Sequence, residues 1–574
     1  MVGPRADRDR VARMNRALHH RGPDDQGVYA AEEVALGHTR LAIIDLSPGG
    51  HQPMVFGDYV ITFNGEIYNF KALKAELPGP FLTASDTEVI LHLYARYGAS
   101  CVDRLEGMFA FVIYDRRRRE VFAARDRLGM KPFYYTLQGD TLAFASELKA
   151  LLLDGAPPMD RTALRDYFTY GYVPAPKSAY EGIAKLPAAH TLTFRAGALH
   201  VARYWEPSAA IRHREPAAAV EALDEILGRV IRAHTLADVP VGVFLSGGLD
   251  SATLTSYLER PKTFTLGFDV AARSEAEAAA GVARHFGTAH RSEVAGAGDL
   301  DQALSVMPSL FDEPFADSAA WSNYLIARAA RREVTVALSG EGGDELFCGY
   351  PRYWQYDGRR SLSARLLARW LPPLSSLGQS MERRAHGGLD GYAARFSQLT
   401  RPQLPALLGP AYSLPGYDDL WFYRQHWRED LDPIQRMRWL DLHTNLAEGL
   451  LTKVDRSSMA HSLEVRPPLL DHRLVEFALS VDPALWVDRA RGEGKGLLRR
   501  LMGPRLPPGH LSRPKSGFGL PVRRWIRANP ALVAGASDRL LAAGVLRRPI
   551  PADFRRTFAL LSFDRWWSAA GAGP

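Results

Sequence analysis

Short apolar runs separated by polar turns dominate the first third of the chain. Between Val34 and about Phe194, segments such as VALGHTRLAIIDL, YVITFNGEIYNF and MFAFVIYD alternate with turns rich in Gly, Asp and Pro. Runs of this length and composition predict β-strands. One clear helix is predicted over residues 86–96, with Asp86 as its cap, and residues 8–18 also have a helical pattern. This part of the chain is therefore predicted to be a sheet-rich domain.

From residue 217 the pattern changes, because apolar runs now alternate with helical stretches. The predicted order is a helix over 217–236, a buried strand over 239–245, a helix over 252–259, a strand over 263–268 and a helix over 275–286. Strands that alternate with helices predict a parallel sheet covered on both faces. After Tyr350 the pattern is mostly helical, and the stretch from about Ala534 gives no clear prediction. The polar, Pro-containing residues 206–216 are predicted to link a domain of residues 1–205 to one of residues 217–574.

Composition narrows the class of protein. A length of 574 residues exceeds what one hydrophobic core supports, which agrees with two domains. No apolar run is long enough to span a membrane and the start lacks an export signal, so we expect a cytoplasmic protein. Two cysteines, Cys101 and Cys348, make neither a disulfide framework nor a metal-ligand pattern. The net charge of +7 is dispersed, so we expect no nucleic-acid partner, and because no apolar run could span a membrane we expect no membrane partner.

The most informative motif is SGGLDS at residues 246–251, which follows the apolar run VPVGVFL and precedes a helical pattern. A strand that enters a glycine pair and then a helix is a typical anion site. Gly247 and Gly248 let backbone N–H groups approach phosphate, and the helix dipole favours negative charge. The spacing of a Walker loop is absent. Taken alone, the motif also fits an ordinary strand-to-helix connection with Asp250 in the first helical turn.

A second turn of the same kind occurs in VTVALSGEGGDELFCGY, where a strand over 334–338 leads into residues 339–345. Turns at the carboxyl ends of two strands in one parallel sheet meet in the crevice where open α/β sheets bind ligands. The two glycine-rich turns are therefore predicted to contact the same ligand.

These motifs resemble the asparagine synthetases, as do DEPFADSAA at 312–320, LLTKVDRSSMAHSLEVRPPLLD at 450–471 and RPKSGFGLP at 513–521. The resemblance covers nearly all of residues 215–530 and implies an N-type ATP pyrophosphatase domain, a doubly wound parallel α/β sheet with helical additions. The ATP-binding residues that it implies are Leu245, Ser246, Gly247, Gly248, Asp250, Ser251, Leu266, Ser339 and Gly340. It also implies Mg²⁺ to offset the phosphate charge, with Asp250 and Asp344 as its carboxylates.

The chemistry implied by this resemblance has two steps. A carboxylate attacks the α-phosphorus of ATP to give an acyl adenylate and pyrophosphate, and ammonia then displaces AMP to form an amide. Glu341 is the candidate for deprotonating the ammonia or controlling its arrival. Lys515, and secondarily Lys453, would stabilise charge on phosphate and on the tetrahedral intermediate. For Lys495 the expectation is a place on the surface.

Upstream motifs are similar to a class II glutamine amidotransferase domain: HRGPDDQG at 20–27, RLAIIDL at 40–46, FNGEIYN at 63–69 and SDTEVI at 85–90. That resemblance implies an α/β/β/α sandwich of two sheets between helices. Arg40 would bind the α-carboxylate of glutamine, Asp86 would accept its ammonium, and Asn64 with the Gly65 amide would form an oxyanion hole. The implied glutamine-binding residues are Arg40, Leu41, Ala42, Ile43, Ile44, Asn64, Gly65, Glu66 and Asp86.

In that family the nucleophile is an N-terminal cysteine whose own amino group is the base. This chain begins Met-Val-Gly, and neither of its cysteines lies where it could substitute. Residues 1–7 also leave no room for a first strand before the predicted helix. Either the recorded start lies downstream of the true one, or glutamine hydrolysis has been lost. The retained glutamine-binding residues favour the first interpretation.

We therefore expect a ligase that converts aspartate, ATP and glutamine or ammonia into asparagine, AMP and pyrophosphate, with ATP and Mg²⁺ as cofactors and a homodimer as its assembly. Two alternatives share the same machinery: amidation of another carboxylate, in a cell-envelope sugar or a secondary metabolite, and ring closure as in lactam synthetases. A protein of another class, an inactive scaffold, is disfavoured because an inactive site has no reason to keep several converging polar groups.

Overall fold

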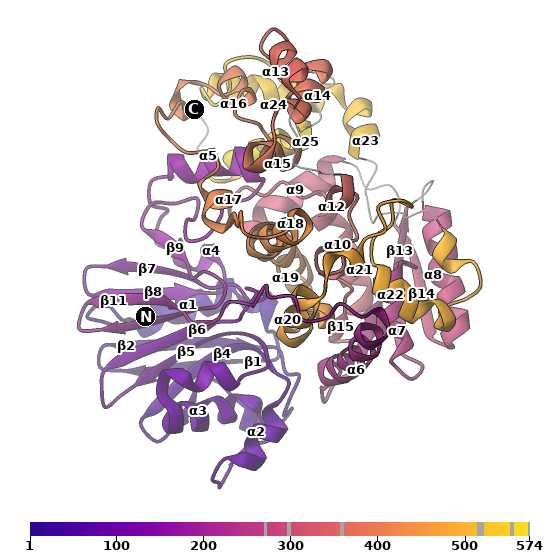
Figure 1. Ribbon diagram of the computed structural model, residues 1–574. Coiled ribbons are helices and arrows are strands. Elements are labelled where there is room, and N and C mark those ends of the chain that lie inside the picture. Colours follow the sequence, from indigo (N-terminus) through magenta and orange to yellow (C-terminus); the bar gives the residue numbers. More distant parts are fainter. Residues whose placement is uncertain (269–271, 296–299, 356–360, 514–521, 552–555, 572–574) are drawn as a thin grey trace.

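The computed structural model in Figure 1 shows two layered parts that meet along a broad junction. It describes residues 1–268, 272–295, 300–355, 361–513, 522–551 and 556–571. Antiparallel sheets, coloured indigo to purple, fill one side of the view, and a parallel sheet with many helices fills the other. The last helices, in yellow, return across the molecule toward the first part.

The first part is built on two antiparallel sheets. One has six strands in the order β11-β10-β6-β5-β4-β3. The other combines the hairpin β1-β2 with three strands in the order β8-β7-β9. The strand bounds are β1 Asp25–Ala31, β2 Val34–Arg40, β3 Met54–Phe56, β4 Tyr59–Ile67, β5 Gly107–Asp115, β6 Glu120–Arg125, β7 Tyr134–Gln138, β8 Thr141–Ala145, β9 Ile183–Lys185, β10 His190–Arg195 and β11 Ala198–Arg203.

Helices cover the outer faces of both sheets. Helices α2 (Phe70–Glu76) and α3 (Asp86–Tyr97) pack on the six-stranded sheet, while α1 (Arg8–Ala17) and α4 (Leu148–Leu151) pack on the other. Apolar side chains from both sheets fill the space between them, among them Val34, Leu36, Val60, Val112, Val121 and Leu192. The predicted α/β/β/α sandwich is confirmed.

Val2 joins the two halves of the second sheet. It forms antiparallel bridges with Val34 of β2 and Leu142 of β8, and its amide donates to the Leu142 carbonyl at 2.8 Å. Residues 1–7 form no strand before α1, as predicted, and Val2 pairs with the sheet only through these two isolated bridges. Helix α1 begins at Arg8, where the helical pattern predicted it, and the Asp7 side chain caps its first turn.

The second part contains a parallel sheet of five strands in the order β14-β13-β12-β15-β16. Their bounds are β12 Val241–Phe244, β13 Lys262–Phe268, β14 Ala289–Ala295, β15 Val336–Leu338 and β16 Glu464–Arg466. The three strands predicted by the apolar runs are confirmed, within a few residues at each end. The edge strands β14 and β16 were not predicted.

Helices surround this sheet and make up most of the chain after Tyr350, as predicted. Helix α5 (Arg161–Tyr170) belongs to the first part. The helices from residue 216 to 385 are α6 Pro216–His234, α7 Leu249–Ser256, α8 Ala272–Phe286, α9 Leu300–Phe311, α10 Ala319–Ala330, α11 Gly343–Leu346, α12 Arg352–Gln355, α13 Leu362–Ala368 and α14 Ser376–Ala385. They continue with α15 Gly388–Phe396, α16 Gln403–Leu407, α17 Trp421–His426, α18 Pro433–Asp441, a π-helix Leu442–Leu450 and α19 Leu451–Met459. The last are α20 His472–Ser480, α21 Pro483–Trp486, α22 Gly496–Met502, α23 Val522–Ala528, α24 Pro530–Ala542 and α25 Thr557–Ala569.

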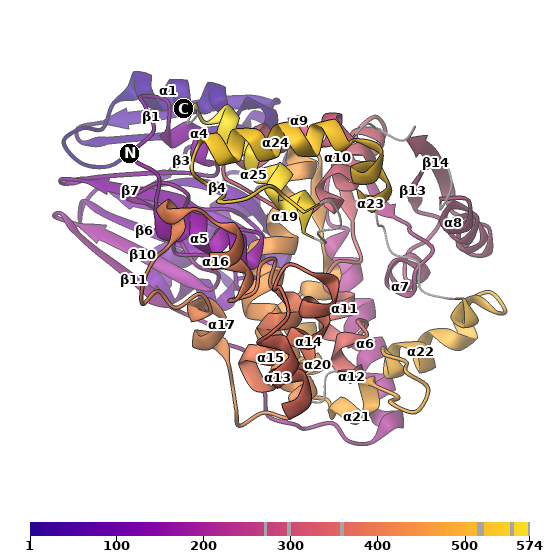
Figure 2. The same cartoon turned by 90° about the horizontal axis from the view of Figure 1, so that it is seen from above.

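The C-terminal helices α24 and α25 pack against one another over the junction of the two parts (Figure 2). The Tyr167 hydroxyl of α5 donates to the carbonyl of Ala559 at 2.6 Å, and Phe563 packs on Phe168 with ring centroids 4.7 Å apart. These helices therefore tie α5 of the first part to α9 of the second. In the described part of the chain, none of the helices combines the length and apolar composition needed to cross a bilayer.

Candidate active sites

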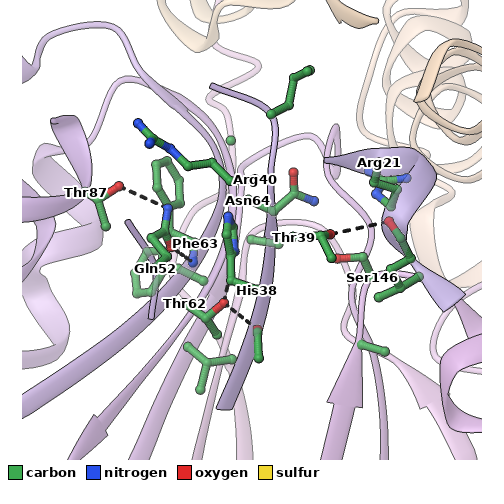
Figure 3. A pocket seen from close by; sticks show the side chains of 18 of the residues that line it. Arg21, His38, Thr39, Arg40, Gln52, Thr62, Phe63, Asn64, Thr87 and Ser146 are labelled. Carbon is green, nitrogen blue, oxygen red and sulfur yellow. Dashed lines mark hydrogen bonds between the residues drawn. The ribbon is translucent and has the colours of Figure 1, made fainter. Parts of the chain in front are cut away.

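A cavity of about 150 Å³ lies in the first part, between the ends of β2 and β4 and the start of α3. All of the predicted glutamine-binding residues except Ala42 line it. Figure 3 shows Arg40, Asn64 and Arg21 around this cavity. Met459 of α19 and Glu464 of β16 also line it, so the pocket extends to the second part of the chain.

Strand β4 brings Asn64, Gly65 and Glu66 to the cavity wall. Gly65 has a φ of +147°, and a Cβ at this position would lie 2.0 Å from the carbonyl oxygen of Met108, so only glycine fits beside β5. Asn64 Nδ2 and Glu66 Oε2 are buried and have no hydrogen-bond partner among the described residues. Because buried polar groups are normally paired, unpartnered groups on a cavity wall indicate a place for a polar ligand.

Asp86 lies at the first position of α3 and is 4% exposed. The predicted cap is wrong by one residue, because the Ser85 hydroxyl accepts the amide of Thr87 and is the cap. Asp86 Oδ2 instead accepts the amide of Ile67 at 3.0 Å. Burial raises the pKa of Asp86 to about 6. A buried carboxylate in this position would be stabilised in its ionised form by a cationic group of a ligand.

Arg40 ends strand β2 and is nearly buried. Its guanidinium donates to the carbonyl oxygens of Ser47 at 3.1 Å, of Ile44 at 3.3 Å and of Asp45. These contacts fix the loop that forms the rim of the cavity. The bidentate contact of Arg40 with a carboxylate stays a prediction, since two of its nitrogens already serve the loop.

The residues that line this cavity include no thiol. Cys101 and Cys348 are both fully buried elsewhere, and burial raises the pKa of each thiol to about 12. Both thiols are therefore poor nucleophiles. The Met1 amino nitrogen faces the cavity wall, donating to the carbonyl of Ala35 at 2.6 Å, and burial lowers the pKa of this amine to about 5.

The nucleotide motif forms a compact turn between β12 and α7. The Ser251 hydroxyl accepts the amide of Ser246 at 3.2 Å and donates to the Gly248 carbonyl at 3.2 Å. Gly247 has a φ of +73°, and its Cβ would lie 2.7 Å from Ala278 Cβ. Gly248 is the cap position of α7 and supplies no side-chain hydrogen bond. The start of this helix thus keeps the features of an anion site.

The second glycine-rich turn packs directly against the first. Strands β12 and β15 are neighbours, with Val241 opposite Val336, so their carboxyl ends lie side by side. A Cβ on Gly343 would lie 2.5 Å from Asp250 Cγ, and one on Gly340 would lie 3.0 Å from Asp250 Cβ. The absence of side chains on these glycines allows Asp250 to sit against the second turn. The structure therefore brings the two turns together, as predicted.

Asp250 and Asp344, the candidate metal ligands, both contact Lys495. Its Nζ lies 2.5 Å from Asp250 Oδ2 and 2.6 Å from Asp344 Oδ1. Lys495 is 8% exposed, so the expectation of a surface position is wrong. Burial alone would lower the pKa of Lys495, but Asp250 and Asp344 outweigh it and raise the pKa. Nothing in the local sequence separates this lysine from a surface one, because its partners are 245 and 151 positions away.

Glu341 and Lys453 form a second charged pair at the same crevice. Lys453 Nζ of α19 lies 3.8 Å from Glu341 Oε1 and 3.4 Å from Asp317 Oδ2. Burial, with Lys453 acting in the opposite sense, raises the pKa of Glu341. Burial alone would lower the pKa of Lys453, yet Asp317 and Glu341 raise it. The lysine stays charged, and the raised pKa suits Glu341 to proton transfer.

The other predicted residues of this site differ in their placement. Ser339 is buried and its amide donates to the carbonyl of Arg466 at 2.9 Å. The Leu245 side chain is buried in the largest core cluster, and Leu266 lies in the cluster with Phe264 and Leu304, so only their backbones are left for a ligand. Lys515 lies outside the described residues.

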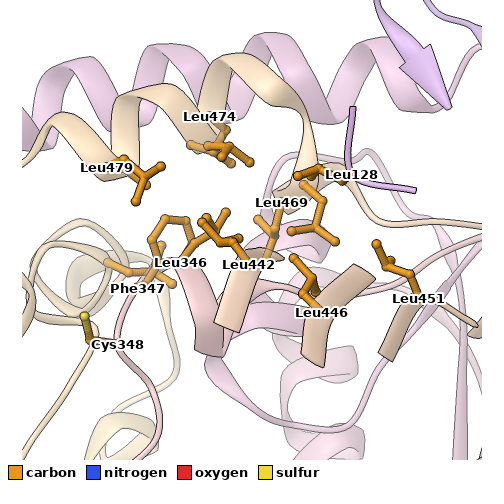
Figure 4. Packing of buried hydrophobic residues seen from close by; sticks show 14 of the residues in the cluster. Leu128, Leu346, Phe347, Cys348, Leu442, Leu446, Leu451, Leu469, Leu474 and Leu479 are labelled. Carbon is orange, nitrogen blue, oxygen red and sulfur yellow. The ribbon is translucent and has the colours of Figure 1, made fainter. Parts of the chain in front are cut away.

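Apolar packing holds the second glycine-rich turn in place. Leu346, Phe347 and Cys348 follow it and pack beside Leu442, Leu446 and Leu474 (Figure 4). All six side chains are at least 97% buried. The turn that carries Glu341 and Asp344 is therefore held by a rigid core.

Buried ion pairs connect the two parts of the chain. Arg21 of the first part lies 2.8 Å from both Glu147 and Asp455. Arg456 of α19 lies 2.8 Å from Glu147 and 2.8 Å from Asp312. A similar contact joins Arg466 to Glu66 of the cavity wall at 3.3 Å. Glu66 was predicted to hold a substrate, but one of its oxygens serves this junction.

Two family models match the chain and define its class as an amidotransferase joined to a synthetase. The glutamine amidotransferase domain matches residues 1–205, and asparagine synthase matches residues 222–548. The chain belongs to the asparagine synthase family.

Among relatives, glutamine-hydrolyzing asparagine synthetase 1 of Bacillus subtilis (strain 168) is 34% identical over 542 residues, which cover 90% of this chain and 84% of the relative. A putative glutamine-hydrolyzing asparagine synthetase of Mycobacterium tuberculosis is also 34% identical, covering 91% of this chain and 85% of the relative. Among solved structures, an allosteric regulatory enzyme of purine biosynthesis is 16% identical with a TM-score of 0.30, covering 51% of this chain and 79% of that one.

Proposed function

We propose that this chain forms an amide from a carboxylate, aspartate in the first instance, with ATP as the energy source and glutamine or ammonia as the nitrogen source. The products are asparagine, AMP and pyrophosphate. The observation that carries this proposal is the meeting of two glycine-rich turns that bring together Asp250 and Asp344, both in contact with Lys495, and Glu341, whose Oε1 lies 3.8 Å from Lys453 Nζ. Membership of the asparagine synthase family supports it.

The first step activates the acceptor. A carboxylate oxygen of the substrate bonds to the α-phosphorus of ATP, the bond from that phosphorus to the bridging oxygen breaks, and pyrophosphate leaves. The turn at Ser246–Ser251 and the start of α7 would bind the phosphates, with Ser339 and Gly340 beside them. Lys495 and Lys515 would offset the charge that gathers on the leaving pyrophosphate.

Mg²⁺ fits the two carboxylates of this crevice, because Mg²⁺ is commonly held by one or two carboxylates together with phosphate oxygens. Asp250 and Asp344 would hold it, and it would offset phosphate charge. Lys495 contacts the same two carboxylates.

The second step forms the amide. The ammonia nitrogen attacks the acyl carbon, the bond from that carbon to the phosphate oxygen breaks, and AMP leaves. Glu341 would take the proton that the nitrogen loses, and its raised pKa supports that role. Lys453, held near Glu341, would stabilise negative charge on the tetrahedral intermediate.

Helix α19 would join the two sites. Met459 lines the glutamine cavity and Lys453 contacts Glu341, and both belong to this helix. Six residues of helix span roughly 9 Å, a short distance for a nitrogen source released in the cavity. In the cavity, Asn64 with the Gly65 amide, Asp86 and Arg40 would bind glutamine, and the buried amide nitrogen of Asn64 supports the oxyanion role.

The assay that tests the proposal measures pyrophosphate and AMP with ATP, Mg²⁺ and ammonium across candidate carboxylates. Release that depends on aspartate and yields asparagine supports it. Release that depends only on another carboxylate would support the adenylation chemistry but show that the acceptor is not aspartate. No release with any carboxylate would contradict the proposal and favour the alternative of an inactive scaffold protein.

The nitrogen source is tested with the same assay. Because no thiol lines the cavity, we expect ammonium to support amide formation by this chain and glutamine not to support it. A chain extended at its start by Met-Cys-Gly and a strand-forming segment should release glutamate from glutamine through Asn64, Gly65 and Asp86. Glutamate release by the chain as it stands would contradict the first expectation.

We further propose that the enzyme acts in the cytoplasm as a homodimer, with residues 1–205 and 217–574 as its two domains and 206–216 as the linker. Limited proteolysis within 206–216 and light scattering of the intact chain test these two points. Cleavage inside either domain, or a monomeric mass, would contradict them.

A further inference from the structure

Large apolar side chains are gathered on one exposed segment far from both sites. Ten such side chains are exposed in the described part of the chain, and five of them lie between residues 362 and 377. They are Leu362, Leu366, Leu367, Trp370 and Leu377, with Trp370 89% exposed and Leu362 68% exposed. Single exposed apolar residues are common on proteins, but a group of this size marks an interaction surface.

Helices α13 and α14 carry this group and pack against each other as a hairpin. Leu362 and Leu366, four residues apart, lie on the same side of α13, and Trp370 follows two residues after the helix ends at Ala368. The hairpin forms the top of the molecule in Figure 1 and lies well apart from α7 in both views. The apolar group is thus on an outer extremity and not at a crevice.

Positive charges outnumber negative ones on this hairpin, whose one acidic residue, Glu382, lies in α14. Residues 361–381 contain Arg365 and Arg369 and no Asp or Glu. Both arginines are exposed, and neither has a carboxylate within 4.0 Å among the described residues. They line a cavity of about 480 Å³ beneath the hairpin.

The acidic groups of that cavity already have partners. Glu382 lies 3.5 Å from His386, Asp390 lies 3.6 Å from Arg401, and Asp419 lies 2.7 Å from Arg165. Arg365 and Arg369 are therefore left to bind anions from outside the chain. Guanidinium groups bind phosphate oxygens well, and two that lie next to an apolar surface favour a ligand with both kinds of group.

We propose that the α13–α14 hairpin docks this enzyme on an anionic membrane surface. Leu362, Leu366, Leu367 and Trp370 enter the headgroup boundary of the bilayer, and Arg365 and Arg369 bind lipid phosphates. Short basic segments with Trp and Leu on one side bind membranes in this way, and Trp prefers the interface. The inference goes beyond the proposed function and does not depend on it.

A second copy of the chain fits this surface less well. A symmetric contact through the hairpin would bring the unpaired arginines of two copies together, and each chain already carries a net charge of +7. An anionic bilayer supplies both the negative charge and the apolar layer. The expectation of no membrane partner rested on the lack of a spanning segment, and surface docking needs none.

The test is sedimentation of the full chain with vesicles of phosphatidylglycerol and phosphatidylcholine, compared with vesicles of phosphatidylcholine alone. We expect binding to the first kind that weakens in high salt, since each arginine near an anionic surface contributes about fivefold in affinity. The pair R365Q/R369Q should therefore lose roughly 25-fold in affinity for the anionic vesicles, and the pair L366S/W370S should no longer bind them. The matched control L82S/L153S, at two other exposed leucines, should bind like the unmodified chain.

Pyrophosphate release and the mass in solution are measured for each variant. Unchanged release in R365Q/R369Q and L366S/W370S shows that both still fold, because the hairpin lies apart from the crevice. Equal sedimentation with both kinds of vesicle, or equal binding by all variants, would overturn the proposal. A fall from dimer to monomer in L366S/W370S without vesicle binding by the unmodified chain would overturn it too, and would assign the surface to a second copy.

Discussion

The glutamine cavity and the nucleotide crevice handle buried polar groups in opposite ways. In the cavity, Asn64 Nδ2 and Glu66 Oε2 have no partner among the described residues. In the crevice, Lys495 bridges Asp250 and Asp344, and Lys453 lies between Glu341 and Asp317. The cavity is therefore prepared for a neutral, polar ligand. To bind a charged ligand, the crevice must replace its internal ion pairs with contacts to that ligand.

This difference agrees with the ligands that we propose. Glutamine carries no net charge, so a preformed set of hydrogen-bonding groups suits it. ATP brings several negative charges and a metal, so carboxylates held near a lysine are neutralised until it arrives. The following changes test whether the two regions differ in this way and whether their junction matters to both.

We expect the largest effect from a change in the buried ion pairs at the junction of the two parts of the chain, and it should appear in the free energy of unfolding. Arg456 is 2% exposed and pairs with Glu147 and Asp312, so Arg456→Met removes a buried cation from both carboxylates, which keep their contacts with Arg21 and Lys149. Removing one partner of a buried ion pair costs about 3–5 kcal/mol in the free energy of unfolding. Denaturant unfolding measures this loss. Arg428→Met is the control, because Arg428 and Asp430 form a solvent-exposed pair whose loss should change the free energy of unfolding little.

The crevice should be next in sensitivity. Asp250→Asn removes a carboxylate that contacts Lys495 and that we propose to hold Mg²⁺. We expect pyrophosphate release to fall roughly 10²- to 10³-fold with unchanged unfolding, which is the size of effect seen when one electrostatic group of a site is removed. Asp224→Asn, which changes a carboxylate of α6 paired with Arg505, should leave the rate intact. A near-normal rate in Asp250→Asn would contradict the assignment of the site.

Lys495→Met tests the ion pairs of the crevice themselves. Two charge-assisted contacts of Lys495 are lost, and one such contact is worth about 1.5–3 kcal/mol. We therefore expect kcat/KM for ATP to fall at least about tenfold, while Lys495→Arg recovers part of it. If Lys495→Met kept the normal kcat/KM, the lysine would be a structural group and the contrast with the cavity would fail.

Glutamine binding in the cavity should depend on pH, and the change should be smaller than the effects of the crevice substitutions. Burial raises the pKa of Asp86 to about 6, and only its ionised form pairs with the ammonium of glutamine. Raising the pH from 5 to 7 ionises this carboxyl, so glutamine affinity should rise about tenfold and then level off. Calorimetric titration measures it. In Asp86→Asn the affinity should be weak at every pH, and a flat profile in the unmodified chain would contradict the role of Asp86.

Much of the fold was predictable because its elements are long and regular in pattern. The strands on either side of Ser246–Ser251 and Ser339–Gly340 follow apolar runs that lead into glycine turns, and both turns lie together as predicted. The strand β14 was missed because its residues alternate little and lie at the sheet edge. The strand β16 has only three residues, all buried, which is too short for a periodic signal.

The site was less predictable where it depends on distant contacts. Lys495 was expected on the surface, yet it meets Asp250 across 245 positions of sequence. Arg466, which contacts Glu66, belongs to a motif that carried the family resemblance but had no assigned role. Asp86 was found at the cavity, although the helix cap proved to be Ser85. Local patterns identify motifs, whereas only the folded chain shows which charges they neutralise.

The most direct test of the central claim is to follow oxygen from the acceptor to AMP. Aspartate with oxygen-18 in its side-chain carboxylate is incubated with the chain, ATP, Mg²⁺ and ammonium, and the AMP is analysed by mass spectrometry. If the carboxylate attacks the α-phosphorus, each AMP formed carries one labelled oxygen, and pyrophosphate carries none. Formation of ADP and labelled inorganic phosphate, or of AMP without label, would contradict activation of the acceptor as an adenylate.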